Sequence, residues 1–234
     1  MNWQDEGFLL SKIKFRENAN IINVFTNNRG KVSGIVYGGT SRKIRNFLQI
    51  SNKIFIIHSS KSDNRLGYFK TEIVEAISPK YFSNKKKTSA LLSISSILNL
   101  LLPESQPYKS LYDSLDNLLN NFDQDNWIIL YIYWELKLLK DLGFDPFLEQ
   151  FILNEDLISK YKTVEIDNIK YQVPNFLLSK EKTSSLENKQ ISMALSFTRS
   201  ILTNKFFFPN NLQFPKSRMI LENYFNWFAI SKEK

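Results

Sequence analysis

The first third of the 234-residue chain alternates between short apolar runs and polar turns. Ile44, Phe47 and Leu48 recur at helical spacing behind Ser41, a common N-cap residue, so we predict a short helix there. Five runs rich in β-branched and aromatic residues predict strands, two of them after this helix. They are Phe8–Phe15, Ile21–Thr26, Lys31–Tyr37, Lys53–His58 and Leu66–Ile77. Five strands with a helix between the third and the fourth are the pattern of an OB-fold barrel.

From residue 88 onward the apolar positions recur at helical spacing. The predicted helices are Ser89–Leu102, Lys109–Phe122, Asn126–Leu142, Leu186–Lys205 and Ser217–Ser231. Ser184 with Glu187 forms a capping-box pattern ahead of the fourth helix, and residues 163–173 alternate around Asp167-Asn168 as in a small hairpin.

Glycine and proline divide the chain near Pro79, because six of the seven glycines precede residue 68 and all seven prolines follow residue 78. Glycine suits tight turns between strands, and proline ends helices. We therefore predict an α+β protein with an N-terminal OB-fold β-barrel domain over residues 1–79. A mostly α-helical C-terminal domain over residues 80–234 follows, with the hairpin as an insertion.

The positive charge lies almost entirely in the first part of the chain. Overall, 31 Lys and Arg against 23 Asp and Glu give a net charge of +8. Residues 1–87 hold 16 basic and 6 acidic side chains, net +10, and residues 88–234 hold 15 and 17, net −2. Such a one-signed field attracts polyanions, which favours nucleic acid as a partner. The alternative is an adaptor whose basic barrel binds acidic protein tails instead of DNA.

The strongest candidate binding cluster is Gly38–Arg45, where two glycines precede three cations. Backbone amides at a helix start and guanidinium groups both bind phosphate, and further cations extend the cluster along the predicted strands. The predicted nucleic-acid-binding residues are Lys12, Arg29, Lys31, Arg42, Lys43 and Arg45. Aromatic residues on the strands could add stacking platforms for bases, although most should be core. These are Tyr37, Phe55, Tyr68 and Phe69, whereas Lys85–Lys87 reads as a solvated linker after the barrel.

Several chemistries have little support in the composition. The chain has no Cys and one His, and it has no P-loop glycine-lysine motif, so we expect no catalytic residue, no cofactor and no metal. A metal-dependent nuclease remains the enzymatic alternative, because carboxylates are paired at Asp113/Asp116, Asp123/Asp125 and Glu155/Asp156. No apolar run is long enough to span a membrane, so we expect a cytoplasmic protein without membrane contact, which would be nucleoid-associated if its partner is DNA.

Four segments resemble the RecO family of DNA repair proteins. They are the opening Trp3-Gln-Asp-Glu-Gly-Phe-Leu-Leu10, the stretch Thr26–Arg42 with Gly-Lys-Val-Ser-Gly-Ile-Val-Tyr-Gly-Gly at its centre, Phe47-Leu-Gln49 and Leu66-Gly-Tyr-Phe-Lys-Thr-Glu72. The resemblance is dense over residues 1–76. It continues sparsely beyond them, at Leu142-Gly143-Phe144, Arg199–Leu202 and Pro215–Arg218.

The resemblance implies a non-catalytic recombination mediator. Its OB-fold would bind single- and double-stranded DNA, anneal complementary strands and, with RecR, help load RecA onto strands covered by single-strand-binding protein. It also implies that the acidic, apolar-ended tail of single-strand-binding protein docks on the helical domain. The candidate cations for that contact are Arg199, Lys205, Lys216 and Arg218.

Two segments depart from the family pattern. Many family members carry a cysteine-rich zinc element in the C-terminal domain, but residues 144–178 contain no cysteine, so no metal is expected there. Where relatives tend to read Leu-Gln-Pro-Gly, this chain reads Leu48-Gln-Ile-Ser51. The sequence therefore does not predict the conformation of the turn before the fourth strand.

Overall fold

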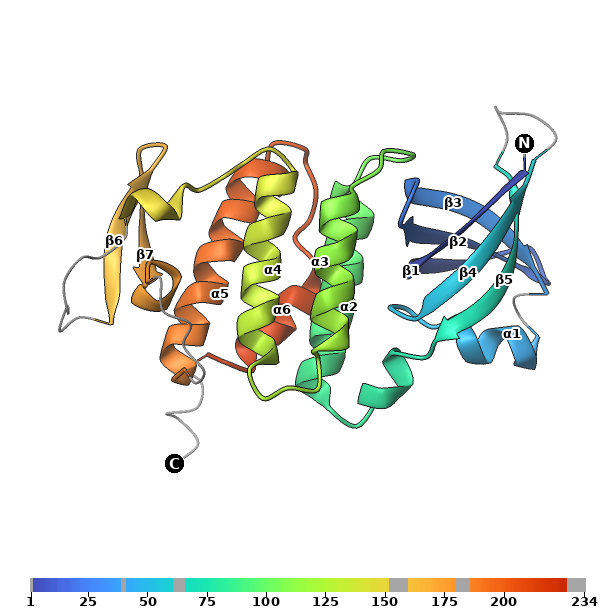
Figure 1. Cartoon of the computed structure of the whole chain (residues 1–234), viewed down its shortest axis with the longest axis horizontal. Helices are drawn as coiled ribbons and strands as arrows, with labels where there is room; N and C mark the ends of the chain where they lie inside the picture. Colours follow the sequence, from blue (N-terminus) through green and yellow to red (C-terminus); the bar gives the residue numbers. More distant parts are fainter. Residues whose placement is uncertain (1, 39–40, 61–65, 152–159, 180–185, 227–234) are drawn as a thin grey trace. The chain divides into compact units, whose positions relative to one another are not determined.

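The computed structural model describes residues 2–38, 41–60, 66–151, 160–179 and 186–226 (Figure 1). The chain divides into two compact units. The first comprises Met1–Asp113 with Pro215–Arg218, and the second comprises Ser114–Phe214 with Met219–Lys234. The domain boundary predicted at residue 79 follows the last strand of the first unit, which continues beyond that boundary to Asp113.

Five strands of the first unit form a closed barrel in the order β1-β2-β3-β5-β4. They are β1 (Asn2–Phe15), β2 (Ala19–Thr26), β3 (Gly30–Tyr37), β4 (Lys53–Ser59) and β5 (Tyr68–Glu75). All neighbours are antiparallel except β3 and β5, which meet in parallel at Ile35 and Tyr68. This order and the helix between β3 and β4 confirm the predicted OB-fold.

The first strand begins six residues before its predicted start. Residues Asn2–Phe8 pair with β4, and residues Gly7–Phe15 pair with β2, so β1 joins two neighbours in succession. The early part was missed because the run from Asn2 to Glu6 is mostly polar. Pairing on both sides of β1 is what closes the sheet on itself.

The barrel interior is filled by apolar side chains, each stabilising the fold by about 1.5–3 kcal/mol when fully buried. This core consists of Leu9, Ile22, Val24, Val32, Val36, Leu48, Ile54, Ile56 and Phe69. The predicted short helix is present as α1 (Arg42–Phe47), and the Ser41 side chain accepts a hydrogen bond from the Ile44 amide. Ile44 and Phe47 pack against the core. Helix α1 is therefore held by its apolar face, which leaves its polar face to solvent.

The turn before β4 contains a serine in a backbone conformation that favours glycine. Ser51 has φ +71°. Its hydroxyl bonds the Leu91 carbonyl oxygen at 3.1 Å and the Ser95 hydroxyl at 2.8 Å, and its amide donates to the Leu9 carbonyl oxygen at 2.7 Å. These bonds hold Ser51 in a conformation that glycine would adopt without strain.

Helix α2 (Lys85–Leu101) packs against β1 within the first unit. Its N-cap is Asn84, whose side-chain oxygen accepts a hydrogen bond from the Lys87 amide at 3.1 Å. The prediction of a linker at Lys85–Lys87 was therefore wrong, because these lysines form the first turn of the helix. Tyr112, on α3 (Lys109–Asn120), contacts the rings of Phe8 and Phe25 on the barrel.

The second unit is built around α4 (Trp127–Asp141) and α5 (Asn188–Leu202), which pack side by side (Figure 1). The buried carboxylate of Glu135 on α4 accepts hydrogen bonds from the Tyr131 hydroxyl at 2.8 Å and the Thr198 hydroxyl of α5 at 2.5 Å. The N-cap of α5 is Glu187, in a capping box with Gln190. The predicted cap, Ser184, lies outside the described residues.

The predicted hairpin is confirmed as β6 (Tyr161–Ile166) and β7 (Ile169–Pro174), joined by the two-residue turn Asp167-Asn168. Both turn residues have positive φ angles, as a tight hairpin requires. The last helix, α6 (Lys216–Asn223), ends at Asn223, whereas the prediction extended it to Ser231. Residues 227–234 lie outside the described part of the chain.

Ser51→Ala is expected to destabilise the protein more than Ser51→Gly, by about 1 kcal/mol. Both variants lack the same hydroxyl, but only glycine relieves the positive φ angle. Urea unfolding of the three proteins measures the difference. Equal stabilities of the two variants would contradict the assignment of strain to this position.

Candidate nucleic-acid interface

Cations gather around α1 at the barrel. Arg42 and Arg45 are exposed on the helix. Lys12 of β1 is half-buried, and its ammonium group donates to the carbonyl oxygen of Leu48, the C-cap of α1, at 2.6 Å. Burial lowers the pKa of Lys12, and the nearby positive charge of Arg45 lowers it further. Lys43 also lies on α1, but its side chain is outside the described part of the structure, as are residues 39–40.

Arg42 and Arg45 form no ion pair with a carboxylate among the described residues. Both guanidinium groups are exposed, so they can reach an external anion, and Arg matches phosphate geometry with two parallel bonds. The structure thus brings Lys12, Arg42 and Arg45 together, and we name these three residues the α1 cluster.

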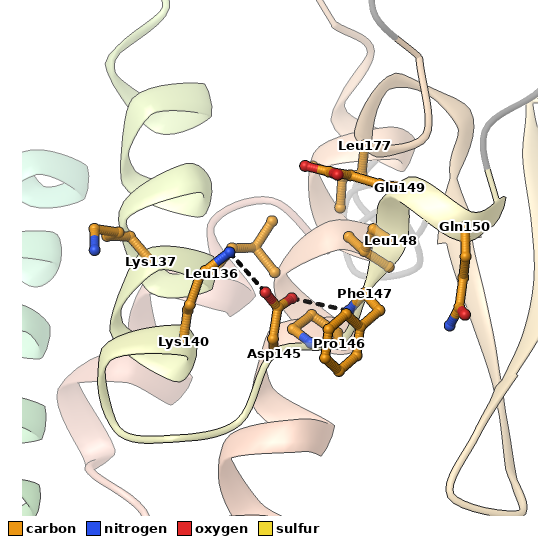
Figure 2. A pocket seen from close by; sticks show the side chains of 10 residues that line it. All are labelled: Leu136, Lys137, Lys140, Asp145, Pro146, Phe147, Leu148, Glu149, Gln150 and Leu177. Atoms are coloured by element: carbon orange, nitrogen blue, oxygen red, sulfur yellow. Dashed lines mark hydrogen bonds and ion pairs between the residues drawn. The ribbon is translucent and has the colours of Figure 1, made fainter.

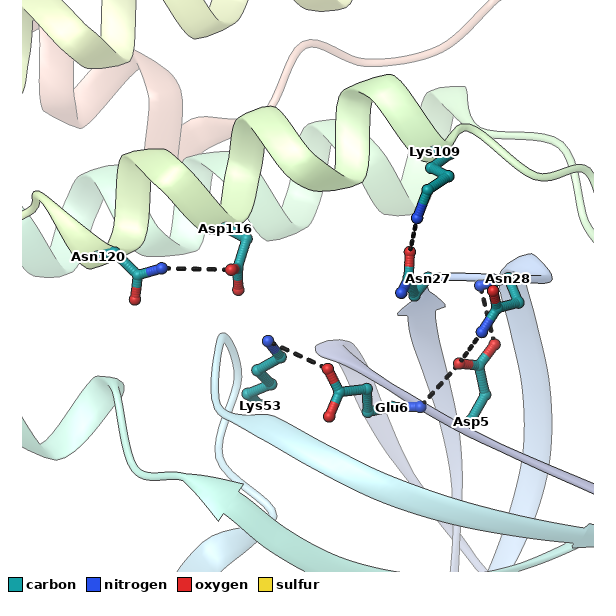
Figure 3. A network of polar contacts seen from close by, with 8 residues as sticks. All are labelled: Asp5, Glu6, Asn27, Asn28, Lys53, Lys109, Asp116 and Asn120. Carbon is teal, nitrogen blue, oxygen red and sulfur yellow. Dashed lines mark hydrogen bonds and ion pairs between the residues drawn. The ribbon is translucent and has the colours of Figure 1, made fainter.

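Arg29 lies at the opposite end of β3, in the turn that precedes this strand. Its guanidinium group sits over the ring of Trp3, 4.6 Å from the centroid. The buried carboxylate of Asp5 holds the turn, accepting hydrogen bonds from the amide and the side chain of Asn28 at 3.0 and 2.9 Å (Figure 3). The exposed Arg29 is therefore fixed at a distinct place from the α1 cluster.

Lys31 is only 9% exposed. Its ammonium group donates to the Asn99 carbonyl oxygen near the end of α2 at 2.9 Å, and burial lowers its pKa although Glu104 opposes the shift. The contact joins the barrel to α2. Because this ammonium group is covered, we leave Lys31 out of the candidate surface.

Two of the four candidate stacking aromatics are exposed. Tyr37 is 52% and Tyr68 43% exposed, and their rings stack at a centroid distance of 5.3 Å and an angle of 26°. A side-chain hydrogen bond with Tyr68 raises the pKa of the Tyr37 phenol. Phe69 is buried in the barrel core, and Phe55 is half-buried.

The four cations predicted for protein docking do not form one exposed rim. Arg218 is fully buried, with 0% of its surface exposed. Arg199 lies 3.1 Å from the Glu222 carboxylate, without hydrogen-bond geometry, and Lys205 pairs with Asp167 at 2.5 Å. Lys216 is exposed at the start of α6.

The second unit contains a hollow of about 580 Å³ that sequence reasoning missed (Figure 2). It is bordered by Leu136, Lys137 and Lys140 of α4, by residues 145–150 and by Leu177. Lys140 pairs with Asp145 at 2.8 Å, and this hydrogen bond raises the pKa of Lys140 and lowers that of Asp145. No single stretch of sequence signals the hollow, because three separate segments line it.

Among the described residues, no group of three or more His, Cys, Asp and Glu side chains could hold a metal ion. The pair Glu155/Asp156 lies outside these residues. In the same part of the chain, no helix is both long and apolar enough to cross a membrane.

Comparison with known families gives two adjacent matches. The model of the recombination protein O N-terminal domain matches residues 1–77, and that of the recombination protein O C-terminal domain matches residues 83–155. Together the two matches cover more than half of the chain.

Several curated proteins are similar to this chain. The DNA repair protein RecO of Ruegeria sp. (strain TM1040) is 34% identical over 145 residues, covering 62% of this chain and 60% of the relative. That of Roseobacter denitrificans is 33% identical over 150 residues, covering 64% and 62%. That of Wolbachia pipientis wMel is 34% identical over 146 residues, covering 62% and 60%. The matches thus span about 60% of the length of these relatives.

Among solved structures, Entamoeba histolytica asparaginyl-tRNA synthetase aligns with a TM-score of 0.30 at 8% identity, covering 92% of this chain and 60% of that chain. A similarity this low carries no argument about fold or function.

Proposed function

Because the chain belongs to the RecO family, we propose that it is a DNA repair and recombination mediator that binds single- and double-stranded DNA and anneals complementary strands. In this proposal it acts with RecR and helps load RecA onto strands covered by single-strand-binding protein. It catalyses no reaction, and its effect comes from binding and positioning strands.

The observation that carries the proposal is the α1 cluster on the OB-fold barrel. Arg42 and Arg45 are exposed and have no carboxylate partner among the described residues, in a region of net charge +10 over residues 1–87. Phosphates that bind there release condensed counterions, which is the main source of affinity in contacts to the nucleic-acid backbone. Arg29, on its Trp3 platform, offers one more guanidinium group at the far end of β3.

Annealing follows from the same contacts. Two complementary strands repel each other through their phosphates, and bound cations screen that repulsion. Contacts to phosphates carry no sequence information, so the bases stay free to pair and binding has little sequence preference. In this proposal the closed barrel holds the cations in fixed positions, where they can bind the phosphates of both strands.

We propose that the hollow of the helical unit receives the acidic, apolar-ended tail of single-strand-binding protein. Leu136, Leu148 and Leu177 give it an apolar lining (Figure 2). Lys137 and Lys140 supply its cations, and they pair with Asp141 and Asp145, carboxylates with which an acidic tail would compete. Lys205 lies over the ring of Phe144, which immediately precedes the lining segment, so one of the four sequence-predicted cations is near this hollow. The exposed Phe147 is the aromatic contact best placed for the end of the tail.

Reversing the charges in Arg42→Glu/Arg45→Glu is expected to weaken DNA binding and to flatten its salt dependence. For single strands the slope of log K against log salt should shrink by about 0.7 for each phosphate that the variant no longer neutralises. Fluorescence anisotropy over a salt series, with single-stranded and duplex DNA, measures both quantities.

The matched control is Lys170→Glu/Lys189→Glu, which changes the net charge equally at exposed positions of the helical unit. It should leave the slope nearly unchanged. If both double variants act alike, net charge alone governs binding and the α1 cluster is not the site. Binding of an acidic peptide but of no DNA would favour the adaptor alternative.

Phe147→Ala is expected to weaken binding of a synthetic single-strand-binding-protein tail peptide by about fivefold or more, because truncating a central aromatic contact typically costs that much. Isothermal titration calorimetry measures the affinity. Phe208→Ala is the control, since Phe208 is also highly exposed but does not line the hollow. Unchanged peptide affinity in Phe147→Ala would exclude the hollow as the docking site.

A further inference from the structure

A row of apolar side chains crosses four strands on the outside of the barrel. Ile13, Ile21, Ile35 and Tyr68 are consecutive cross-strand partners on β1, β2, β3 and β5. Because side chains alternate between faces and Ile22 belongs to the core, this row faces outward. Ile13, at one end of the row, is 64% exposed, and Tyr68, at the other end, is also open to solvent, whereas Ile35 beside Tyr68 is buried.

The row ends at the stacked pair Tyr37 and Tyr68. The two rings belong to β3 and β5, the only strands of the barrel that meet in parallel. Besides the pairing of Ile35 with Tyr68, the Ile35 amide donates to the Gly67 carbonyl oxygen at 2.9 Å. The two stacked rings are about half exposed and so offer an aromatic surface to solvent at this junction.

One cation, Arg16, lies near this pair of rings, and backbone hydrogen bonds link its turn to the start of α1. Arg16, in the turn between β1 and β2, is exposed and close enough to lower the pKa of Tyr37 slightly against the larger effect of Tyr68. The Gly38 amide donates to the Asn18 carbonyl oxygen of that turn at 2.8 Å, and the Ser41 amide donates to the Gly38 carbonyl oxygen at 2.8 Å. These bonds tie the Arg16 turn and the end of β3 to the start of α1, which carries Arg42 and Arg45.

From this arrangement we propose that Tyr37 and Tyr68 form a stacking platform for the bases of single-stranded nucleic acid, with the backbone passing from Arg16 to the α1 cluster. Aromatic rings with cations nearby match a strand that offers unstacked bases and phosphates together. The inference rests on the proposed function and adds to it the chemistry that distinguishes a single strand from a duplex.

The distinction has a simple physical basis. In a duplex the faces of the bases are stacked on one another, so a duplex can use the arginines but not the tyrosine rings. A single strand can use both. The arginines should therefore bind both forms of DNA, and the tyrosines should add affinity for the single strand alone.

The test compares Tyr37→Ala/Tyr68→Ala with the wild-type protein in anisotropy titrations. Loss of stacking should weaken single-strand binding by about fivefold or more, while duplex affinity and the salt slope stay unchanged. Tyr37→Phe/Tyr68→Phe keeps the rings and removes only their hydroxyls, so it should bind single strands like the wild type.

An abasic oligonucleotide supplies the matched ligand. It keeps the phosphates and lacks the bases, so it should bind the wild type and the double alanine variant equally. In photocrosslinking with the wild-type protein, a single strand that carries 5-iodouracil should become attached to Tyr37 or Tyr68. This measurement does not depend on the folding of any variant.

Unchanged single-strand affinity in the alanine variant, an equal loss for duplex and abasic DNA, or a crosslink confined to other residues would overturn the platform. So would capture of an acidic peptide, without DNA, at these tyrosines. Failure of the proposed function looks different, because then Arg42→Glu/Arg45→Glu leaves the binding of every DNA form unchanged. If Arg42→Glu/Arg45→Glu weakens DNA binding but Tyr37→Ala/Tyr68→Ala does not, the proposed function stands and only the stacking site is excluded.

Discussion

Closure of the five-stranded barrel is the constraint that decides which N-terminal cations can meet a ligand. Strand β1 pairs with β4 through residues Asn2–Phe8 and with β2 through Gly7–Phe15, and the resulting interior is packed with apolar side chains. A charged group cannot enter that interior without a large desolvation cost. The charged end of each Lys or Arg side chain must therefore lie at an end of the barrel, on its outer face or under another element.

The predicted nucleic-acid-binding cations, which the sequence alone does not distinguish, therefore lie in different surroundings. Lys31 is covered by α2 and bonds its backbone, Lys12 emerges beside α1 and bonds the carbonyl oxygen of its C-cap, and Arg42 and Arg45 stay open to solvent. Lys31 thus holds α2 on the barrel, whereas Lys12 holds α1 and also adds its charge to the α1 cluster; burial lowers the pKa of both lysines. Exposed arginines retain the donors and the permanent charge that phosphate binding requires.

Local sequence patterns predicted most of the helices, strands and turns, because residues close together in the sequence determine these features. Alternation defined the strands, the Ser41 cap defined α1, and Asp167-Asn168 defined the hairpin turn, where both residues adopt positive φ angles. Features that depend on contacts distant in sequence were not predictable in this way. Burial of Lys31 and Arg218, the hollow lined by three segments and the exposed tyrosine pair all require the folded chain.

We propose that DNA binds on the side of the barrel formed by the β1–β2 turn, the end of β3 and α1. Hydrogen exchange of the full chain with and without single-stranded DNA tests this placement most directly. Slower exchange in peptides that cover residues 12–18, 36–38 and 41–48 is the predicted result. Protection confined to the helical unit, with these peptides unchanged by saturating DNA, would contradict it.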